Sequence, residues 1–189
     1  MSLMDNAIAT YEAAARMVSR LLDSRTDLLA DGLSSLSSRP SLHLGGGYKD
    51  IGASLGVCLP AESRATMSRL PLSDGPVGAS PSVEVLTADI EWMTFEGWLS
   101  DPRARVCFVE IGVDAERPIT ADVFLRCIGP DGEFLSDSAP VEWRLPLNGP
   151  AVLEVPLTCA GEGRRKMVIH LRRPPERMIL RRLAITTLP

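Results

Sequence analysis

From residue 82 to the end of the chain, hydrophobic and polar residues alternate with a period of two, as they do along strands that bury one face. Clusters of Gly, Pro and Asp interrupt this alternation, and no stretch has the period of a helix. The pattern predicts about eight short strands, over residues 83–92, 95–99, 105–113, 119–128, 141–147, 151–157, 166–172 and 178–187. We therefore predict a mainly β fold, an antiparallel β-sandwich of jelly-roll type.

Two turn signals punctuate this region. Gly129-Pro130-Asp131-Gly132 has a turn-forming residue at every position. Asn148-Gly149 is the strongest short hairpin signal, and it predicts that the two strands on either side of it pair with each other. Pro146 and Pro156 lack the N–H that a sheet needs, so they predict strands at a sheet edge.

The first 33 residues have instead the four-then-three spacing that places hydrophobic residues along one side of a helix. No Pro or Gly occurs between residues 2 and 30, and Ala, Leu, Arg and Met are frequent. The hydrophobic stripe consists of Met4, Ile8, Tyr11, Ala15, Val18 and Leu22, with Leu29 after a break at Arg25. We predict one amphipathic helix that ends near Gly32.

The stripe on this helix needs a partner, and the sequence leaves two alternatives. The helix packs on its own β domain, or it joins the helices of other copies, because its rhythm is close to that of a coiled-coil seam. Arg25 on the seam and the small side chain of Ala15 weaken the second alternative.

Residues 34–81 are rich in Ser, Gly and Pro, a composition that opposes regular structure. They are predicted to form a linker between a helical segment, residues 1–33, and a sandwich domain, residues 82–189. Gly45-Gly46-Gly47-Tyr48-Lys49 is similar to a phosphate-binding loop, but it lacks the hydroxyl residue after the lysine that such loops use.

A second motif in the linker, Gly52-Ala53-Ser54-Leu55-Gly56, fits the nucleophile elbow of serine hydrolases. That chemistry needs a strand before the serine, a helix after it and an imidazole nearby. Pro60 opposes the helix, and the chain has only two histidines, His43 and His170. A hydrolase is therefore the weakest of the functional hypotheses, and we expect no enzyme.

Charge and composition narrow the functional classes. The net charge of −4 argues against broad nucleic-acid binding, and no hydrophobic run reaches the roughly 18 to 20 residues that span a bilayer. Cys58, Cys107, Cys127 and Cys159 form no close pair, and Cys107 and Cys127 lie in hydrophobic runs typical of free buried thiols. A reducing, cytoplasmic setting is the expectation.

Three tryptophans offer candidate ligand contacts, because exposed indole rings can stack on the apolar faces of sugars. Trp92 and Trp143 are the candidates, with Glu91 and Arg144 beside them for polar contacts. Trp98 is predicted to anchor the core instead.

Positive charge is dense near the end of the chain. The residues predicted to dock an anion or an acidic partner are Arg164, Arg165, Lys166, Arg172 and Arg181. The alternative is a solvated sheet edge that resists aggregation.

Neither histidine has a second ligand at metal-binding spacing, so no metal and no cofactor are predicted. The predicted architecture resembles that of non-catalytic carbohydrate-binding jelly rolls. That resemblance implies a binding module for a glycan. The alternative is a structural or assembly protein whose helix forms a homo-oligomer and whose sandwich docks a protein partner; neither hypothesis involves nucleic acid or a membrane.

Overall fold

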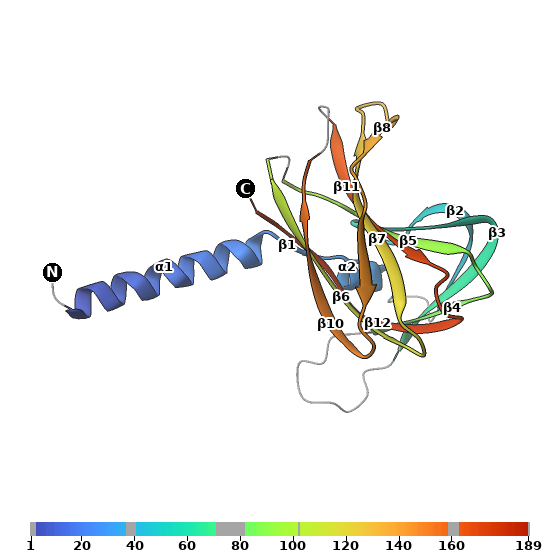
Figure 1. Ribbon diagram of the computed structural model, residues 1–189, viewed down its shortest axis with the longest axis horizontal. Helices are drawn as coiled ribbons and strands as arrows, with labels where there is room; N and C mark the ends of the chain where they lie inside the picture. The colour runs from blue at the N-terminus through green and yellow to red at the C-terminus, as the bar shows by residue number, and fades with distance from the viewer. Residues whose placement is uncertain (1–2, 37–40, 71–81, 102, 159–162, 189) are drawn as a thin grey trace.

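The computed structural model describes residues 3–36, 41–70, 82–101, 103–158 and 163–188. Within them the chain forms two helices and twelve strands (Figure 1). The helices and the first strands are α1 (Leu3–Asp23), β1 (Arg25–Asp27), α2 (Leu28–Ser35), β2 (Ser41–Asp50), β3 (Leu55–Leu70), β4 (Ser82–Thr87) and β5 (Trp92–Trp98). The remaining strands are β6 (Val106–Ala115), β7 (Ile119–Ile128), β8 (Phe134–Asp137), β9 (Val141–Leu145), β10 (Gly149–Pro156), β11 (Arg164–Arg172) and β12 (Arg177–Leu188).

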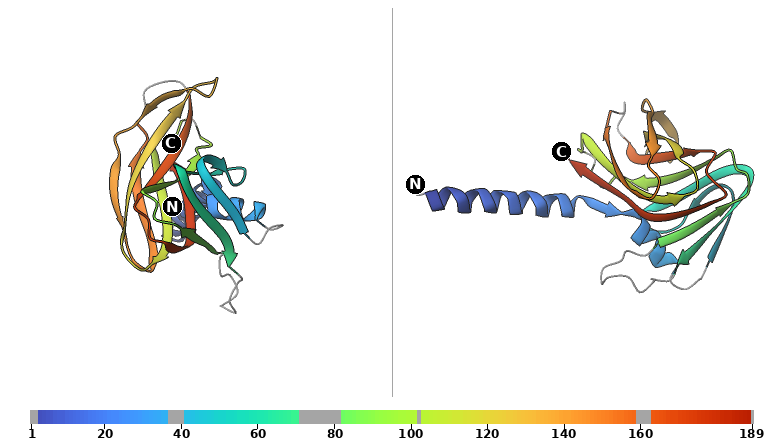
Figure 2. Two further views of the ribbon diagram at one scale, coloured as in Figure 1. Left: turned by 90° about the vertical axis from the view of Figure 1, so that its right-hand side faces the viewer. Right: turned by 60° about the horizontal axis from the view of Figure 1, so that its bottom comes forward.

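The strands form a single antiparallel sheet in the order β10-β6-β12-β4-β3-β5-β11-β7-β8. Three further strands attach to this path: β1 to β12, β2 to β3 and β9 to β7. The sheet is curled so that its two halves face each other across one core (Figure 2). The predicted antiparallel β-sandwich with an N-terminal helix is confirmed.

The core is built by strands whose side chains alternate strictly between the core and the outer face of the sheet. Along β7 every odd-numbered residue from Ile119 to Cys127 is buried, and every even-numbered residue from Thr120 to Ile128 is half-buried. The same parity holds on β11, whose core side chains include Ile169 and Leu171. Because both strands pair residue for residue, their core side chains form one continuous layer.

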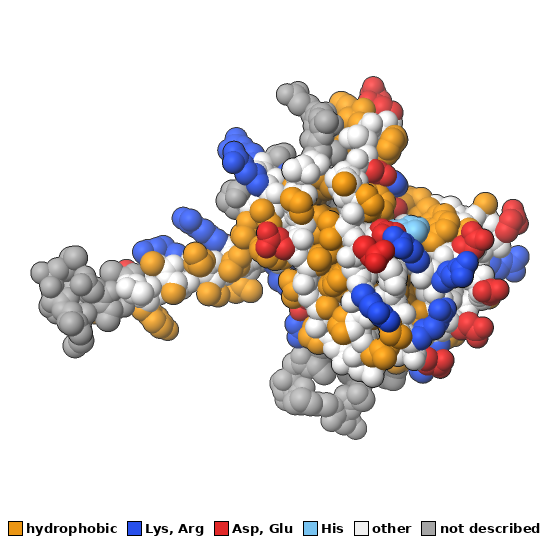
Figure 3. Space-filling view, in the orientation of Figure 1, with side chains coloured by type: hydrophobic (Ala, Val, Ile, Leu, Met, Phe, Trp, Pro, Cys, Tyr) orange, Lys and Arg blue, Asp and Glu red, His pale blue; other side chains and the backbone are white. Residues whose placement is uncertain are grey.

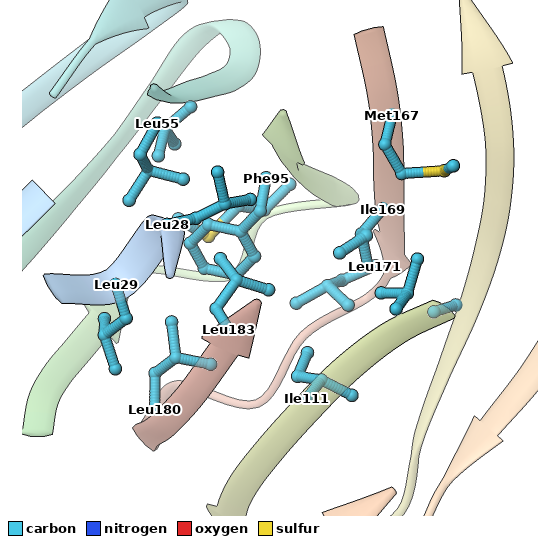
Figure 4. Close-up of a cluster of buried hydrophobic side chains, with 14 of the residues drawn as sticks. Leu28, Leu29, Leu55, Phe95, Ile111, Met167, Ile169, Leu171, Leu180 and Leu183 are labelled. Carbon is cyan, nitrogen blue, oxygen red and sulfur yellow. The ribbon is translucent and has the colours of Figure 1, made fainter. Parts of the chain in front are cut away.

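Side chains from both halves of the sheet meet in this layer (Figure 4). Phe95 of β5 and Leu171 of β11 face Ile111 of β6 and Leu183 of β12, and Leu28 of α2 fills the space beside them. All five are almost completely buried. Burial of each stabilises the fold by about 1.5–3 kcal/mol relative to exposure.

The predicted single helix is broken near Ser24. Arg25 leaves the helical path to pair its guanidinium with Glu110 of β6 at 3.0 Å, and β1 hydrogen-bonds with β12. Asp27 then caps a new helix, because its side chain accepts a hydrogen bond from the backbone N–H of Ala30 at 3.0 Å. Gly32 lies inside α2 rather than at a helix end, so that part of the prediction is wrong.

Helix α1 projects away from the sandwich, while α2 lies against it (Figure 1). In Figure 3 hydrophobic side chains follow the lower side of α1 and Lys or Arg side chains follow its upper side. Neither described helix has the length and apolar character that crossing a bilayer requires.

The predicted linker is wrong over residues 41–70, which form β2 and β3. Gly45 to Gly47 mark a bulge in the pairing of these strands. A Cβ atom on Gly46 would lie 2.0 Å from the carbonyl oxygen of Ala61, so this glycine permits close approach of two backbones rather than binding a phosphate. The rest of the predicted linker includes residues 71–81, which lie outside the described residues.

The two strands beside Asn148 do not pair with each other, contrary to the hairpin prediction. Asn148 has a positive φ of 56°, as a tight turn requires, but β9 pairs with β7 and β10 with β6. The turn therefore carries the chain from one end of the sheet to the other. Pro156 does lie in a strand at the end of the sheet order, as predicted.

The cysteines correct one further prediction. Cys107 is free and buried, as expected, and burial raises the pKa of its thiol to about 12. Cys127, in contrast, is disulfide-bonded, so its interpretation as a free thiol is wrong.

Candidate functional site

The surface of interest is the side of β5, β11 and β7 that faces away from the core, which we call the even face because it carries their even-numbered residues. The pairing register places Trp92, Arg172 and Thr120 in one row across the three strands. The next row consists of Thr94, His170 and Asp122. Residues far apart in sequence are thus neighbours on one surface.

Part of the even face is buried although it faces away from the core. Val168 has no solvent exposure, yet it lies on this face and outside the core cluster. Glu96 and Lys166 are also buried here, and their side chains form an ion pair at 3.1 Å. The carboxylate of Glu96 further accepts a hydrogen bond from the hydroxyl of Thr94 at 3.0 Å. These bonds satisfy the buried polar groups of this part of the face.

Aromatic rings flank the buried lysine. The ammonium of Lys166 lies 4.1 Å from the ring centre of Tyr48 and 4.5 Å from that of Trp98. Tyr48 reaches this position because Gly56 has no side chain, and its hydroxyl donates to Asp50 at 2.7 Å. Burial and this hydrogen bond raise the pKa of Tyr48, which stays a neutral phenol.

Two adjoining pockets extend along the even face and share His170 and Arg172; together we call them the groove. The larger, about 580 Å³, is also lined by Glu91, Trp92, Arg117, Pro118, Thr120 and Arg173. The smaller, about 340 Å³, is also lined by Asp122, Phe124, Asp137, Ser138 and Pro140. In Figure 3 side chains of both charges gather over this side of the sandwich.

An aromatic stack forms one wall of the groove. The rings of Trp92 and His170 lie 5.7 Å apart between centres, with an angle of 30° between their planes. Nδ1 of His170 lies 3.7 Å from a carboxylate oxygen of Asp122. The stack therefore offers a flat apolar surface with a carboxylate beside it.

Arg172 lies where the two pockets meet. Its guanidinium donates to both carboxylate oxygens of Asp122, with one distance of 2.6 Å, and to Glu142 at 3.1 Å. The hydrogen bond from Arg172 to Asp122 raises the pKa of the guanidinium. The side chain is thereby held in one orientation and presents its remaining donor capacity to the groove.

Of the candidates for ligand binding, Trp92 and Glu91 line the groove. Arg144 is exposed on the even face of β9, in register with Thr120 of β7. Trp143 is in register with Ala121, on the opposite side of the sheet, and packs against the core. Trp98, predicted to anchor the core, lies on the even face instead.

The predicted basic surface is not a single surface. Lys166 is buried in its pair with Glu96, and Arg165 donates to the backbone carbonyls of Asp101 and Ala104. Arg181 pairs with Asp114 on β6 at 2.5 Å. The guanidinium of Arg164 lies 4.0 Å from the ring centre of Trp98.

The alternative of a charged sheet edge is also wrong, because β11 and β12 are both interior strands.

The sequence pattern did not single out Asp122 or Arg117 as site residues, and it considered His170 only as a catalytic base or a metal ligand. Asp122 and His170 occupy alternate positions of two predicted strands, a signal that they share the non-core face. Their closeness depends on which strands pair and in what register, and this information is absent from either strand alone.

The nucleophile-elbow motif forms the turn between β2 and β3. Ser54 donates its hydroxyl hydrogen to Asp31 of α2, and the imidazole of His43 contacts the hydroxyl of Thr66 at 3.2 Å. Since His170 stacks on Trp92, no imidazole within the described part of the chain is recorded next to Ser54. Nor do the described residues contain a group of three or more His, Cys, Asp or Glu arranged for a metal ion.

Comparison of the sequence with protein-family models and with curated proteins finds no match. Among solved structures, the enzymatically active domain of bacteriophage CBA120 tailspike protein 4 is similar, with a TM-score of 0.50 and 9% identity. That match covers 86% of this chain and 21% of the tailspike domain, so this chain spans about a fifth of it.

Two carbohydrate-binding modules are also similar, at lower TM-scores. The CBM22-1 xylan-binding domain of Paenibacillus barcinonensis Xyn10C has a TM-score of 0.46 and 9% identity, covering 77% of this chain and 92% of that domain. The family 11 module of Clostridium thermocellum, solved with a mixed-linked tetrasaccharide, has a TM-score of 0.43 and 11% identity, covering 76% and 97%. At such identities the likeness concerns the fold alone.

Proposed function

We propose that this chain is a non-catalytic binding module that holds a glycan in the groove of the even face. The observation that carries the proposal is the Trp92–His170 stack beside the ion pairs of Arg172. A sugar ring has an apolar face that stacks on aromatic rings and a rim of hydroxyls that exchange hydrogen bonds with carboxylates and guanidinium groups. The groove places both kinds of contact side by side.

The size of the groove supports an extended ligand. The two pockets adjoin at His170 and Arg172, with volumes of about 580 and 340 Å³. Pockets for small ligands commonly have about 300–1,000 Å³. A short run of sugars along the groove would stack on Trp92 at one end and contact Asp137 and Ser138 at the other.

Electrophoresis through gels that contain soluble polysaccharides tests this proposal. We expect at least one polysaccharide to retard the protein, and Trp92→Ala to weaken that retardation by about tenfold in dissociation constant, equivalent to roughly 1.4 kcal/mol. Phe134→Ala is the matched control, because Phe134 is an exposed aromatic residue outside both pockets. Equal effects of the two variants, or no retardation by any polysaccharide, would contradict the proposal.

The absence of catalysis is part of the same proposal. Ser54 is bonded to Asp31 of the chain's own α2, which supports a structural role for the motif that contains it. Incubation with a retarding polysaccharide should leave the number of reducing ends unchanged. A steady increase that Asp122→Asn abolishes would instead make the groove an active site, and one that Ser54→Ala abolishes would assign catalysis to the nucleophile-elbow motif.

We further propose that copies of the chain join through α1. Its stripe alternates steps of four and three residues from Met4 to Leu22, which is the repeat of a coiled-coil seam. Ile8, Tyr11, Val18 and Leu22 on this stripe are all exposed, whereas Glu12 and Arg16 form a 3.7 Å ion pair on another side of the helix. A second copy of α1 offers a stripe of the same length and period, so it fits as the partner.

Arg25, whose charge argued against a coiled-coil seam in the sequence, lies outside this helix. Helix α1 ends at Asp23, and the guanidinium of Arg25 is bonded to Glu110 of the sandwich. The seam is therefore uninterrupted up to Leu22. Oligomers of this kind would present several grooves to one polymer and raise the apparent affinity without new contacts.

Light scattering tests the role of α1. Val18→Asp places a charge on the stripe, and we expect it to convert an oligomer into a monomer with an unchanged melting temperature of the sandwich. Met17→Asp is the control, since Met17 is also exposed but lies off the stripe. A native chain that is monomeric at all concentrations, or a Val18→Asp chain of unchanged mass, would rule out the seam.

A further inference from the structure

The end of the groove next to Trp92 has more guanidinium groups than carboxylates. Arg117, Arg172 and Arg173 line it, and Glu91 is the one acidic residue among its lining residues. Arg172 is already paired with Asp122 and Glu142. Arg117 and Arg173 are therefore the two guanidinium groups whose contacts decide how much positive charge this end of the groove carries.

Arg117 is held in place by backbone groups. Its Nη2 donates to the carbonyl oxygens of Arg173 and Pro174, at 3.0 and 3.4 Å. Neutral carbonyls orient a guanidinium but do not cancel its charge. Within the described residues no carboxylate is recorded within ion-pair distance of Arg117, so the full charge remains beside the groove.

Arg173 occupies an unusual turn. Its φ is +44°, in the left-handed region that residues with a side chain rarely adopt, and its backbone N–H donates to the carbonyl of Glu91 at 2.7 Å. Together with the bonds from Arg117, this fixes the turn that follows β11 from two sides. The strained backbone places an exposed guanidinium, with no recorded ion pair among the described residues, at the rim of the groove.

A third guanidinium without a recorded ion pair in the described residues borders the same end. Arg144 of β9 is in register with Thr120 of β7, which lines the larger pocket. Arg144 is exposed, and the described residues supply no recorded ion pair for it. The three arginines come from three different loops or strands, so their convergence is produced by the fold and not by one charged stretch of sequence.

We infer that this end of the groove binds an anionic sugar residue, one that bears a carboxylate or a sulfate. The inference rests on the proposed function and names the class of glycan. A guanidinium presents two parallel N–H donors that match the two oxygens of a carboxylate or sulfate, and such charge-assisted bonds are stronger than those to hydroxyls. The sugar ring would stack on Trp92 while its acidic group faces Arg173 and Arg144.

Isothermal titration calorimetry with tetrasaccharides of equal length tests the inference. The probes are tetragalacturonate, a sulfated carrageenan tetrasaccharide that carries no carboxylate, and neutral xylotetraose. At low salt we expect one of the two anionic probes to bind about tenfold or more tightly than the neutral one, with an advantage that shrinks as NaCl is added. The preferred anionic probe identifies the acidic group.

Two variants locate the effect. Arg173→Gln and Arg144→Gln should each weaken binding of the anionic probe several-fold while leaving neutral binding within about twofold. Arg69→Gln is the control, an exposed arginine on β3 that removes the same charge away from both pockets. Since none of these side chains has a recorded partner in the described residues, the fold should tolerate all three changes.

The outcomes separate this inference from the proposal on which it rests. If neutral xylotetraose binds as tightly as both anionic probes and Trp92→Ala abolishes it, the groove binds glycans and the inference is wrong. If Arg69→Gln weakens anionic binding as much as Arg173→Gln, the effect is one of net charge, which also overturns it. If Trp92→Ala changes the binding of no probe, the proposed function fails as well.

Discussion

The two helices of this chain adjoin in sequence and differ in what covers them. Helix α1 leaves its hydrophobic stripe in solvent, with Tyr11 78% and Leu22 65% exposed. Helix α2 buries its stripe against the sandwich, and Leu28 has no exposed surface. The boundary between the two lies at β1, where Arg25 bonds to Glu110.

This difference shows that an amphipathic pattern establishes the need for a partner but not its identity. Residues 3–23 and 28–35 both have hydrophobic residues at helical spacing. Only the second helix packs against both β3 and β12, and its own domain therefore covers it. A helix in a protein gains most of its stability from the packing of its hydrophobic face, which is why we propose an external partner for α1.

Leu28→Ala gives the largest expected effect on stability. The side chain is fully buried between β5 and β12, so its truncation leaves a cavity in the core, and we expect a loss of about 2–5 kcal/mol in the free energy of unfolding. Urea denaturation followed by circular dichroism measures it.

Met17→Ala is the matched control for this change on α1. Met17 is 66% exposed, and we expect a change within about 0.5 kcal/mol. Similar losses for the two variants would mean that the sandwich also depends on packing by α1.

Gly97→Ala should have the next largest effect, because it disturbs the site where α2 docks. A Cβ on Gly97 would lie 2.5 Å from Cδ1 of Leu28 and 2.8 Å from Cδ1 of Ile185. Overpacking of this kind costs about 1–3 kcal/mol. Thermal melts of a double-mutant cycle with Leu28→Ala measure the coupling, and the cost of Gly97→Ala should fall in that background. Additive losses would show that the close contact is not with Leu28.

Asp27→Ala tests how α2 begins. The carboxylate accepts the N–H of Ala30 at 3.0 Å, and loss of such a cap costs about 1 kcal/mol. Asp27→Asn retains an acceptor and should recover most of the stability in the same urea experiment. If asparagine is as destabilising as alanine, the ion pair of Asp27 with Arg25, and not the cap, holds this segment.

Glu110→Gln should have the smallest effect, and one that depends on pH. Burial tends to raise the pKa of Glu110, but hydrogen bonds from Arg182 and Arg25 outweigh it, so the pKa lies below its usual value of 4.5 in the folded state. The carboxylate therefore contributes its full stability above about pH 4.5, and loses it as the pH falls through the lowered folded pKa.

The difference in melting temperature between the native chain and Glu110→Gln should accordingly be larger at pH 7 than at pH 3. Glu154→Gln on β10 is the control, an exposed glutamate for which the described residues record no ion pair. A pH-independent difference for Glu110→Gln would contradict the ion-pair account.

The sequence predicted most strands of the sandwich well, because their alternation is strong and their ends carry turn residues. The predicted strand at 119–128 coincides with β7. Strand β2 was missed because three consecutive glycines look like a linker, although here they allow a bulge and close backbone contact. The partner of each strand was not predictable from local turn residues, as Asn148-Gly149 shows.

The candidate site was predictable only in part. Trp92 and Glu91 lie in the groove. Trp98 lies on the even face and Trp143 packs against the core, which is the reverse of the predicted positions of these two residues. Strand β5 turns its odd-numbered residues to the core, where the missing side chain of Gly97 makes room for Leu28. That requirement comes from a segment more than sixty residues earlier in the chain, so inspection of β5 alone could not provide it.

The attachment of α1 also determines how the domain would respond to force. Strand β1 continues directly from the helix and pairs antiparallel with β12, an interior strand, while the N–H of Thr187 donates to the carbonyl of Ser24 at 3.2 Å. Because sheet hydrogen bonds run perpendicular to the strands, tension along α1 would shear these bonds together instead of opening them one after another. If the chain is held through this helix while a polymer pulls on its groove, the load would act on the β1–β12 hydrogen bonds in shear. This is the direction in which such a set of bonds resists rupture best.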